Sequence, residues 1–247
     1  MIEEIIIFTV VLVLLLSTAV FGGEEGGDLI VFVHGFFGEP TDLLWLKNEM
    51  EKYGYRGVLV DLPLSLKKIE EAVPHLTEEV ARLENSLNEK ESIHFVGHST
   101  GGLVIRMYLG ENSPAGRNSR CVLIGTPNRG SRLADISSRY TGPVNRIFRT
   151  LESIKPDAVK KMERVSGGPI EIGAVAGSKD DLLLGGLLEG KNDGRVEVRS
   201  VEYSGLKDFV VLPFNHLELI KRPETAELID KFLRRGTFEL EDKEQEK

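Results

Sequence analysis

The chain has 247 residues, of which 41% are hydrophobic and 28% charged, a balance that excludes a disordered chain and allows a sizeable core. Its net charge of −8 excludes a generally basic surface, so nucleic acid is not expected as a partner. The single cysteine, Cys121, excludes an internal disulfide and a cysteine-rich zinc site. We predict no metal ion and no cofactor.

The two ends of the chain differ from its middle. Residues 5–21 form an uncharged apolar segment near the shortest length that spans a bilayer as a helix. Glu3 and Glu4 stand where a signal peptide usually has positive charge, whereas Val20 and Gly22 suit a cleavage site. We predict that residues 1–22 are a signal peptide or membrane anchor, which makes the protein exported (periplasmic or secreted) or membrane-attached. Residues 239–247 are charged and predict a solvated tail.

The middle of the chain alternates between two patterns. Short runs rich in Val and Ile are mostly continuous rather than alternating, which indicates strands of a parallel sheet buried on both faces. They occupy residues 29–33, 57–60, 93–96, 121–124, 170–175, 196–201 and 208–212. Helical patterns lie between them, at residues 42–53, 76–88 after Pro74, 101–110 and 223–234. The class is therefore α/β, in one domain covering residues 28–238, and ligands are expected where the strands end.

One predicted strand leads into a turn that carries a candidate reactive residue. The run 93–96 is followed by Gly97-His98-Ser99-Thr100-Gly101 and then by a helical pattern. In this strand, G-x-S-x-G and helix arrangement, the serine occupies a sharp turn that exposes its hydroxyl at the sheet edge. We predict that Ser99 is a nucleophile.

A serine nucleophile needs a base and a carboxylate that orients the base. His34, His75 and His94 lie upstream of Ser99, and His98 holds a variable motif position that is expected to point away from the reaction. The chain order serine, acid, histidine selects His216 as the base.

Two segments offer the acid. Asp193 lies in an Asp-Gly turn, whereas Asp180 and Asp181 open a leucine-rich stretch that resembles a helix start. We prefer Asp193, because residues 196–212 read as two extended strands that would return the chain to the His216 loop.

A backbone pair is also needed to stabilise an oxyanion. The first strand ends in the glycine-bracketed turn after His34, so the N–H of Phe36 and the N–H of Thr100 are the candidate donors.

These motifs together resemble the α/β-hydrolase superfamily, in its bacterial lipase and esterase branch. The segments that carry the resemblance are His34-Gly35-Phe36-Phe37-Gly38, Gly97 to Gly102, Gly125-Thr126-Pro127-Asn128-Arg129-Gly130-Ser131, Asn192-Asp193-Gly194 and Asn215-His216-Leu217. The resemblance implies a mostly parallel central sheet with helices on both faces and a small helical cap, and it supports Asp193 as the acid. Some of these lipases hold a calcium ion with an aspartate two residues after the histidine; Glu218 stands there in this chain, which puts that site in doubt.

Residues 131–168 leave the strand pattern and are the candidate cap. Val144, Ile147, Phe148, Leu151 and Ile154 form an apolar stripe at helical spacing, with Arg146 and Arg149 opposite. An ordinary amphipathic helix on the sheet would show the same stripe. An apolar cap favours an acyl chain, so we predict a serine hydrolase of carboxylic esters, including lipid esters, with membrane contact through the N-terminal segment. An acyltransferase or thioesterase with the same residues, or a noncatalytic binding protein, is the alternative.

Overall fold

The computed structural model describes residues 27–112, 118–140, 147–162 and 170–239. The predicted signal or anchor segment and the charged tail beyond Glu239 lie outside these ranges. Within them, no helix is both long enough and apolar enough to cross a membrane.

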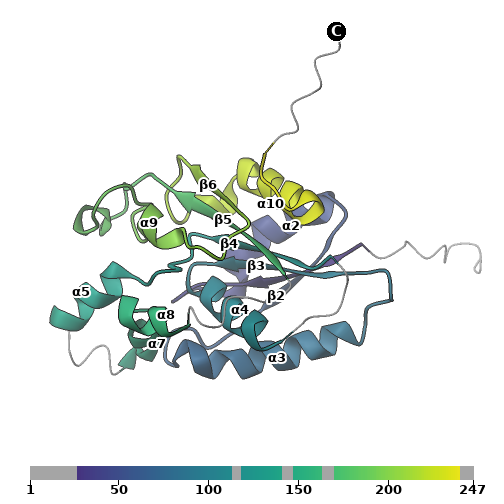
Figure 1. Ribbon diagram of the computed structural model, residues 1–247, viewed down its shortest axis with the longest axis horizontal. Coiled ribbons are helices and arrows are strands. Elements are labelled where there is room, and N and C mark those ends of the chain that lie inside the picture. The colour runs from purple at the N-terminus through teal and green to yellow at the C-terminus, as the bar shows by residue number, and fades with distance from the viewer. Residues whose placement is uncertain (1–26, 113–117, 141–146, 163–169, 240–247) are drawn as a thin grey trace, which may run out of the picture.

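Six parallel strands form one sheet (Figure 1). They are β1 (Leu29–Val33), β2 (Arg56–Val60), β3 (Ile93–His98), β4 (Arg120–Ile124), β5 (Glu171–Gly177) and β6 (Asp208–Leu212). Their order is β2-β1-β3-β4-β5-β6. Because all of these strands are parallel, the strand ends that carry predicted site residues lie at the same edge of the sheet. All five side chains of β1 are buried, as the continuous apolar run predicts for a strand covered on both faces.

Helices cover both faces of the sheet. On one face α3 (Ile69–Glu84) and α4 (Thr100–Glu111) pack on a core that includes Val31, Phe95 and Leu123. On the other face α2 (Leu44–Lys52) and α10 (Pro223–Arg235) pack on a core that includes Phe32 and Val122. Successive side chains of a strand point to opposite faces of the sheet, so each strand contributes to both cores.

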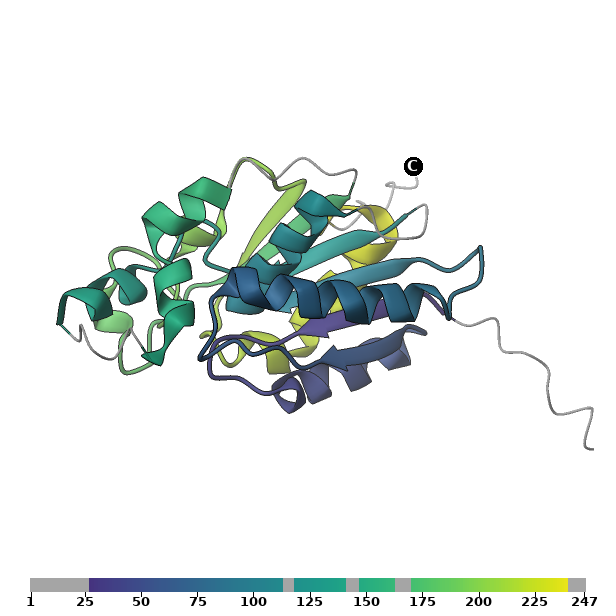
Figure 2. The same ribbon diagram turned by 90° about the horizontal axis from the view of Figure 1, so that it is seen from below.

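Three short helices lie beyond the carboxyl ends of the strands, at the left end of the sheet in Figure 2. They are α5 (Arg132–Tyr140), α7 (Arg149–Ser153) and α8 (Pro156–Met162), all between β4 and β5. Val144 and Arg146 of the predicted stripe lie outside the described residues. The described part is not one continuous helix, because the chain leaves helical geometry at Phe148 before α7 begins. Leu151 and Ile154 nevertheless face the cavity beneath these helices.

Two predicted elements differ from the structure. Residues 196–201 are not a strand: they form the short helix α9 (Val198–Val201). The Asp193 side chain accepts the N–H groups of Arg195 (2.9 Å) and Val196 (2.7 Å), and this closed turn directs the chain into α9. The argument that two extended strands return the chain from Asp193 to His216 is therefore wrong, because β6 alone is extended.

The second difference concerns α3, which begins at Ile69 rather than after Pro74. The Glu71 carboxylate accepts the Lys68 N–H (3.3 Å) and so satisfies a donor at the helix start. Pro74 lies on the exposed face of α3, where water can hydrogen-bond the carbonyl that its missing N–H leaves free.

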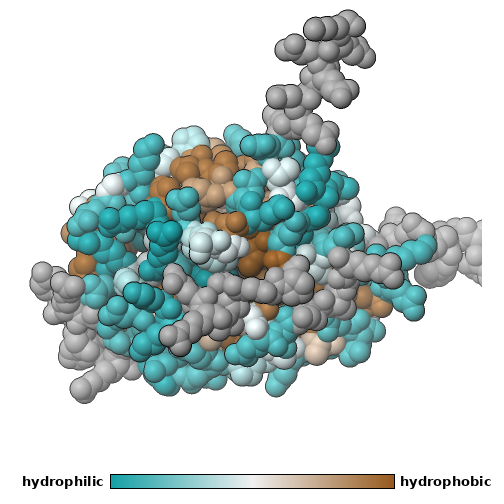
Figure 3. Space-filling model, in the orientation of Figure 1, coloured by the Kyte–Doolittle hydropathy of each residue, from teal (hydrophilic) through white to brown (hydrophobic). Residues whose placement is uncertain are grey.

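One edge of the sheet is β6. Among the described residues, this strand pairs with β5 alone, and its residue Val211 is 39% exposed. Figure 3 shows an apolar area on the molecular surface over this strand. Short edge strands of this kind limit edge-to-edge association by their length.

Removal of residues 1–22 is expected to leave a folded protein, because every described strand and helix begins at or after Leu29. The expected change in the thermal unfolding midpoint is under about 3 °C, which for a chain of this size corresponds to roughly 1 kcal/mol. Circular dichroism of the truncated and full-length proteins measures it. Loss of cooperative unfolding in the truncated protein would show that the segment belongs to the core.

Candidate active site

Ser99 occupies the sharp turn between β3 and α4. Its backbone angles are φ 53° and ψ −126°, and its N–H donates to the Ile124 carbonyl at 2.8 Å. A side chain at Gly97 would lie 2.5 Å from the Cα of Gly102, so strand and helix approach this closely only because both positions are glycine. The strained, hydrogen-bonded turn holds the Ser99 side chain at the carboxyl end of the sheet.

His216 and Asp193 meet directly. His216 Nδ1 lies 2.7 Å from Asp193 Oδ2, and both side chains are buried. The other carboxylate oxygen accepts the two N–H groups of the Asp193 turn, and the His216 N–H donates to the Asp193 carbonyl at 2.8 Å. This carboxylate therefore orients the imidazole through Nδ1–H and leaves Nε2 available to another group.

Asp180 and Asp181, the other candidates for the acid, do not contact His216. The Asp181 carboxylate pairs with the Lys179 ammonium (2.8 Å) and accepts from the Asn215 side-chain amide (2.8 Å). The hydrogen bond from Lys179 holds the pKa of this exposed carboxyl below its usual range. Of the three aspartates, only Asp193 lies at the imidazole.

His98 does not point away from the site as its motif position led us to expect. Its ring lies against that of His216, with 4.6 Å between centroids, and its Nε2–H donates to the His216 carbonyl at 3.1 Å. Burial lowers the pKa of His98 well below its usual range, so the ring is neutral. A neutral donor beside His216 positions the base without adding a competing charge.

Ser99, His216, Phe36 and Thr100 all line one cavity of about 740 Å³. Within the described part of the chain, neither the Phe36 N–H nor the Thr100 N–H donates to another backbone group. The turn that carries Phe36 is closed by a hydrogen bond from the Gly38 N–H to the Gly35 carbonyl (3.1 Å). Both residues that carry the predicted donors thus line the same cavity as Ser99.

Much of the cavity wall is apolar. The apolar lining comes from α5, from α7 and the residue after it, from the loop after β5 and from the turn η4 (Leu219–Lys221). It includes Leu133, Ala134, Leu151, Ile154, Leu182, Val196 and Ile220. Four large apolar lining residues are also exposed: Phe37 (61%), Leu183 (98%), Leu184 (46%) and Leu217 (44%). Phe37 packs edge-on against Phe148 of the cap segment, with 4.7 Å between ring centroids. An apolar cavity with an apolar rim suits a hydrocarbon chain.

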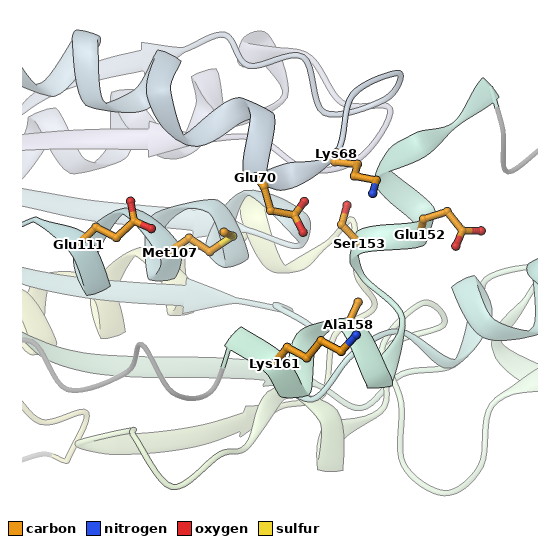
Figure 4. A pocket seen from close by; sticks show the side chains of 8 residues that line it. All are labelled: Lys68, Glu70, Met107, Glu111, Glu152, Ser153, Ala158 and Lys161. Carbon is orange, nitrogen blue, oxygen red and sulfur yellow. The ribbon is translucent and has the colours of Figure 1, made fainter.

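A second cavity, of about 370 Å³, lies where α3 and α4 meet α7 and α8 (Figure 4). Its lining carries two lysines and three glutamates: Lys68, Lys161, Glu70, Glu111 and Glu152. None of the predicted site residues borders it.

Glu218, at the position where some lipases have a calcium ligand, is engaged in ion pairs. Its carboxylate lies 3.2 Å from the Lys179 ammonium and 3.0 Å from the Arg222 guanidinium. Among the residues that the structure describes, no group of three or more His, Cys, Asp or Glu side chains is placed to hold a metal ion.

Besides His98, two further contributors to the site were missed from the sequence. Gly125, at the end of β4, has φ +55°, and a side chain there would lie 3.0 Å from His216 Nδ1 and 3.1 Å from Asp193 Oδ2. His34 donates through Nδ1 to the Gly35 carbonyl (2.9 Å) and accepts the Leu62 N–H at Nε2 (3.2 Å), which ties the Phe36 turn to the segment after β2. Both residues directly follow a predicted strand and lie in loops near predicted site residues, and this position could have identified them from the sequence.

Comparisons with known proteins give one family model and several solved structures that are similar to this chain. A family model described as "Putative serine esterase (DUF676)" matches residues 24–123. No curated protein sequence matches the chain.

Several solved structures share the fold. The mature form of the lipase BlEst2 from Bacillus licheniformis has a TM-score of 0.71 and 21% identity, over 87% of this chain and 94% of that one. The metagenomic carboxyl esterase MGS0156 has a TM-score of 0.61 and 18% identity, over 78% of this chain and 66% of that one. The phospholipase PlaB from Legionella pneumophila has a TM-score of 0.60 and 14% identity, over 84% of this chain and 60% of that one. The expected α/β-hydrolase fold is confirmed.

Gly125→Ala is expected to lower kcat/KM for an ester about tenfold to a hundredfold, because the new methyl group displaces the Asp193–His216 pair. It also strains the backbone at φ +55°, at a cost of about 1–2 kcal/mol. Gly190→Ala is the matched control: it has φ +71° and nothing within 4 Å of the added Cβ. Equal losses of activity in the two variants would show that backbone strain alone accounts for the effect.

Proposed function

We propose that this protein hydrolyses carboxylic esters through an acyl-enzyme on Ser99. The proposal starts from the α/β-hydrolase fold and from the cavity that Ser99 and His216 both line. The observation that carries the proposal is the buried hydrogen bond of 2.7 Å between His216 Nδ1 and Asp193 Oδ2, at a cavity that Ser99 also lines. This is the pairing that converts a serine hydroxyl into a nucleophile, because the histidine accepts its proton while the carboxylate stabilises the resulting cation.

The proposed reaction has two halves. In the first, Ser99 Oγ attacks the ester carbonyl carbon as His216 Nε2 takes the hydroxyl proton. The tetrahedral intermediate then collapses, the C–O bond to the alcohol breaks, and His216 returns the proton to the leaving oxygen. In the second half, water attacks the acyl-enzyme with the same base, releasing the carboxylic acid and regenerating Ser99.

The proposed oxyanion donors are the N–H groups of Phe36 and Thr100. Both residues border the cavity beside Ser99, and neither amide is used by another backbone group among the described residues. Thr100 is the first residue of α4, so the positive end of the helix dipole adds to the field at this point. Each such donor typically contributes a few kcal/mol to lowering the barrier.

The shape and polarity of the cavity support an acyl chain as the group transferred to Ser99. The cap helices and the loop after β5 supply an apolar wall, and a cavity of about 740 Å³ has room for more than the reacting ester group. The structural neighbours include proteins named as a lipase, a carboxyl esterase and a phospholipase. These names support ester or lipid substrates for this chain.

The proposal extends to location. Residues 5–21 are apolar and uncharged, and we propose that they direct export or attach the protein to a membrane. Fractionation of cells that express the full chain, followed by mass analysis of its N-terminus, distinguishes a cleaved signal from a retained anchor; a full-length protein in the cytosolic fraction would contradict both.

Ser99→Ala is expected to lower turnover of 4-nitrophenyl butyrate by several orders of magnitude, because the attacking oxygen is removed. His216→Ala should cause a similar loss, and the double variant should be little worse than either single one, since residues that act as a unit have non-additive effects. Steady-state kinetics measure these losses, with thermal unfolding as the check on folding. Activity within tenfold of wild type in Ser99→Ala would contradict the proposed nucleophile.

Asp193→Asn is expected to lower turnover by up to about 10⁴-fold, because an amide presents the wrong hydrogen-bonding partner to His216 Nδ1–H. Asp181→Asn is the matched control, an exposed aspartate whose partners are Lys179 and Asn215 rather than His216. Its loss should be within about threefold, in keeping with the small worth of an exposed ion pair. A larger loss at Asp181 than at Asp193 would overturn the assignment of the acid.

A further inference from the structure

The charged residues that line the main cavity are unevenly distributed. Two cations, Arg195 and Lys221, belong to the segments that carry Asp193 and His216, and both are exposed. The only carboxylate in the described lining is that of Asp42, near the exit of β1, where it accepts the Glu39 N–H at 3.0 Å. The charged side chains that line the cavity beside the proposed base are therefore both cations.

Neither cation has an ion-pair partner among the residues that the structure describes. Within the described ranges, no carboxylate lies within ion-pair distance of the Arg195 guanidinium or the Lys221 ammonium. Their sequence neighbours behave differently: Arg199 pairs with Glu197 at 2.9 Å, and Arg222 pairs with Glu218 at 3.0 Å. The acidic groups of these two segments are thus engaged elsewhere, and the cations on the cavity keep their full charge.

The position of these cations relates them to one part of the substrate. Arg195 follows Asp193 by two residues, and Lys221 ends the η4 turn (Leu219–Lys221) that follows His216. In the proposed reaction His216 protonates the oxygen of the leaving alcohol, so the alcohol part of the ester lies on the His216 side of Ser99. The apolar cap residues Leu133 and Leu151 line the same cavity and can receive the acyl part.

We propose that the alcohol part of the preferred ester carries a phosphate group, which Arg195 and Lys221 recognise; this inference rests on the proposed esterase function. A phosphate monoester carries between one and two negative charges at neutral pH, which matches two unpaired cations. The substrate class is then acyl esters of phosphorylated alcohols, such as acylated glycerol phosphates. A neutral ester such as a monoacylglycerol fits the same apolar wall but leaves both cations without a partner.

The second cavity does not share this property. It has two lysines but three glutamates in its lining, so an anion entering it meets a larger number of negative charges (Figure 4). Of these two cavities, only the one that Ser99 lines has more cations than carboxylates in its described lining.

The test compares two esters that differ only in the phosphate: 1-butyrylglycerol 3-phosphate and 1-butyrylglycerol. Both are short enough to be used as dissolved monomers, so attraction of the enzyme to a charged lipid surface does not contribute. The measured quantity is the ratio of kcat/KM for the phosphorylated ester to that for the neutral ester. We expect a wild-type ratio above one that falls as salt is added, because exposed charges are screened.

Arg195→Gln and Lys221→Gln should each lower this ratio about threefold, and the double variant about tenfold, as expected for exposed charge pairs. Lys191→Gln is the matched control, because it removes an exposed cation from the same loop that does not line the cavity. The ratio should be unchanged in this variant. Glycerol 3-phosphate should inhibit hydrolysis of 4-nitrophenyl butyrate by the wild type more strongly than by the double variant.

A wild-type ratio of one or less, or an equal fall with Lys191→Gln, would overturn the inference. Turnover of 4-nitrophenyl butyrate distinguishes a failure of this inference from a failure of the proposed esterase function. An enzyme active on this neutral ester but without preference for the phosphorylated one contradicts the inference alone. A well-folded protein with no activity on any of the three esters contradicts the proposed function and this inference with it.

Discussion

The hydrogen bond between Asp193 and His216 is the constraint on which the site depends. It joins the chain segments that follow β5 and β6, and the parallel pairing of Gly177 with Leu212 brings these segments side by side. The approach is so close that a side chain at Gly177 would lie 2.7 Å from the Asp193 Cβ and 2.4 Å from the Phe214 carbonyl. A buried carboxylate is costly unless its oxygens are satisfied, and here two backbone N–H groups and one imidazole satisfy both.

Much of the fold could be predicted from the sequence because parallel strands buried on both faces leave continuous apolar runs, as in Leu29–Val33. Ser99 was identifiable for a local reason: strand, glycines and helix are consecutive in the chain. His216 followed from chain order. What could not be predicted depends on contacts between distant residues, such as the His98 ring against His216 and the close fit of Gly125 to the Asp193–His216 pair. The helix at Val198–Val201 was missed because its β-branched residues favour a strand, whereas the Asp193 turn decides its conformation.

The cavity combines three surfaces with different chemistry. Leu133, Leu151 and the loop after β5 give it an apolar wall, the turns at Phe36 and Thr100 carry the proposed oxyanion donors, and Arg195 and Lys221 give it positive charge. These surfaces are contributed by loops at one end of a rigid parallel sheet, so each can vary without disturbing the core. The proposed substrate, with an acyl chain, an ester carbonyl and an anionic alcohol, has a matching part for each surface.

The most direct test of the account is to treat the full-length protein with a fluorophosphonate and to locate the modified residue by peptide mass spectrometry. Such reagents form a stable adduct only with a serine that a neighbouring base activates. The account predicts one adduct per chain, on Ser99, that does not form in His216→Ala. An adduct on another residue, or none on a folded wild-type protein, would contradict it.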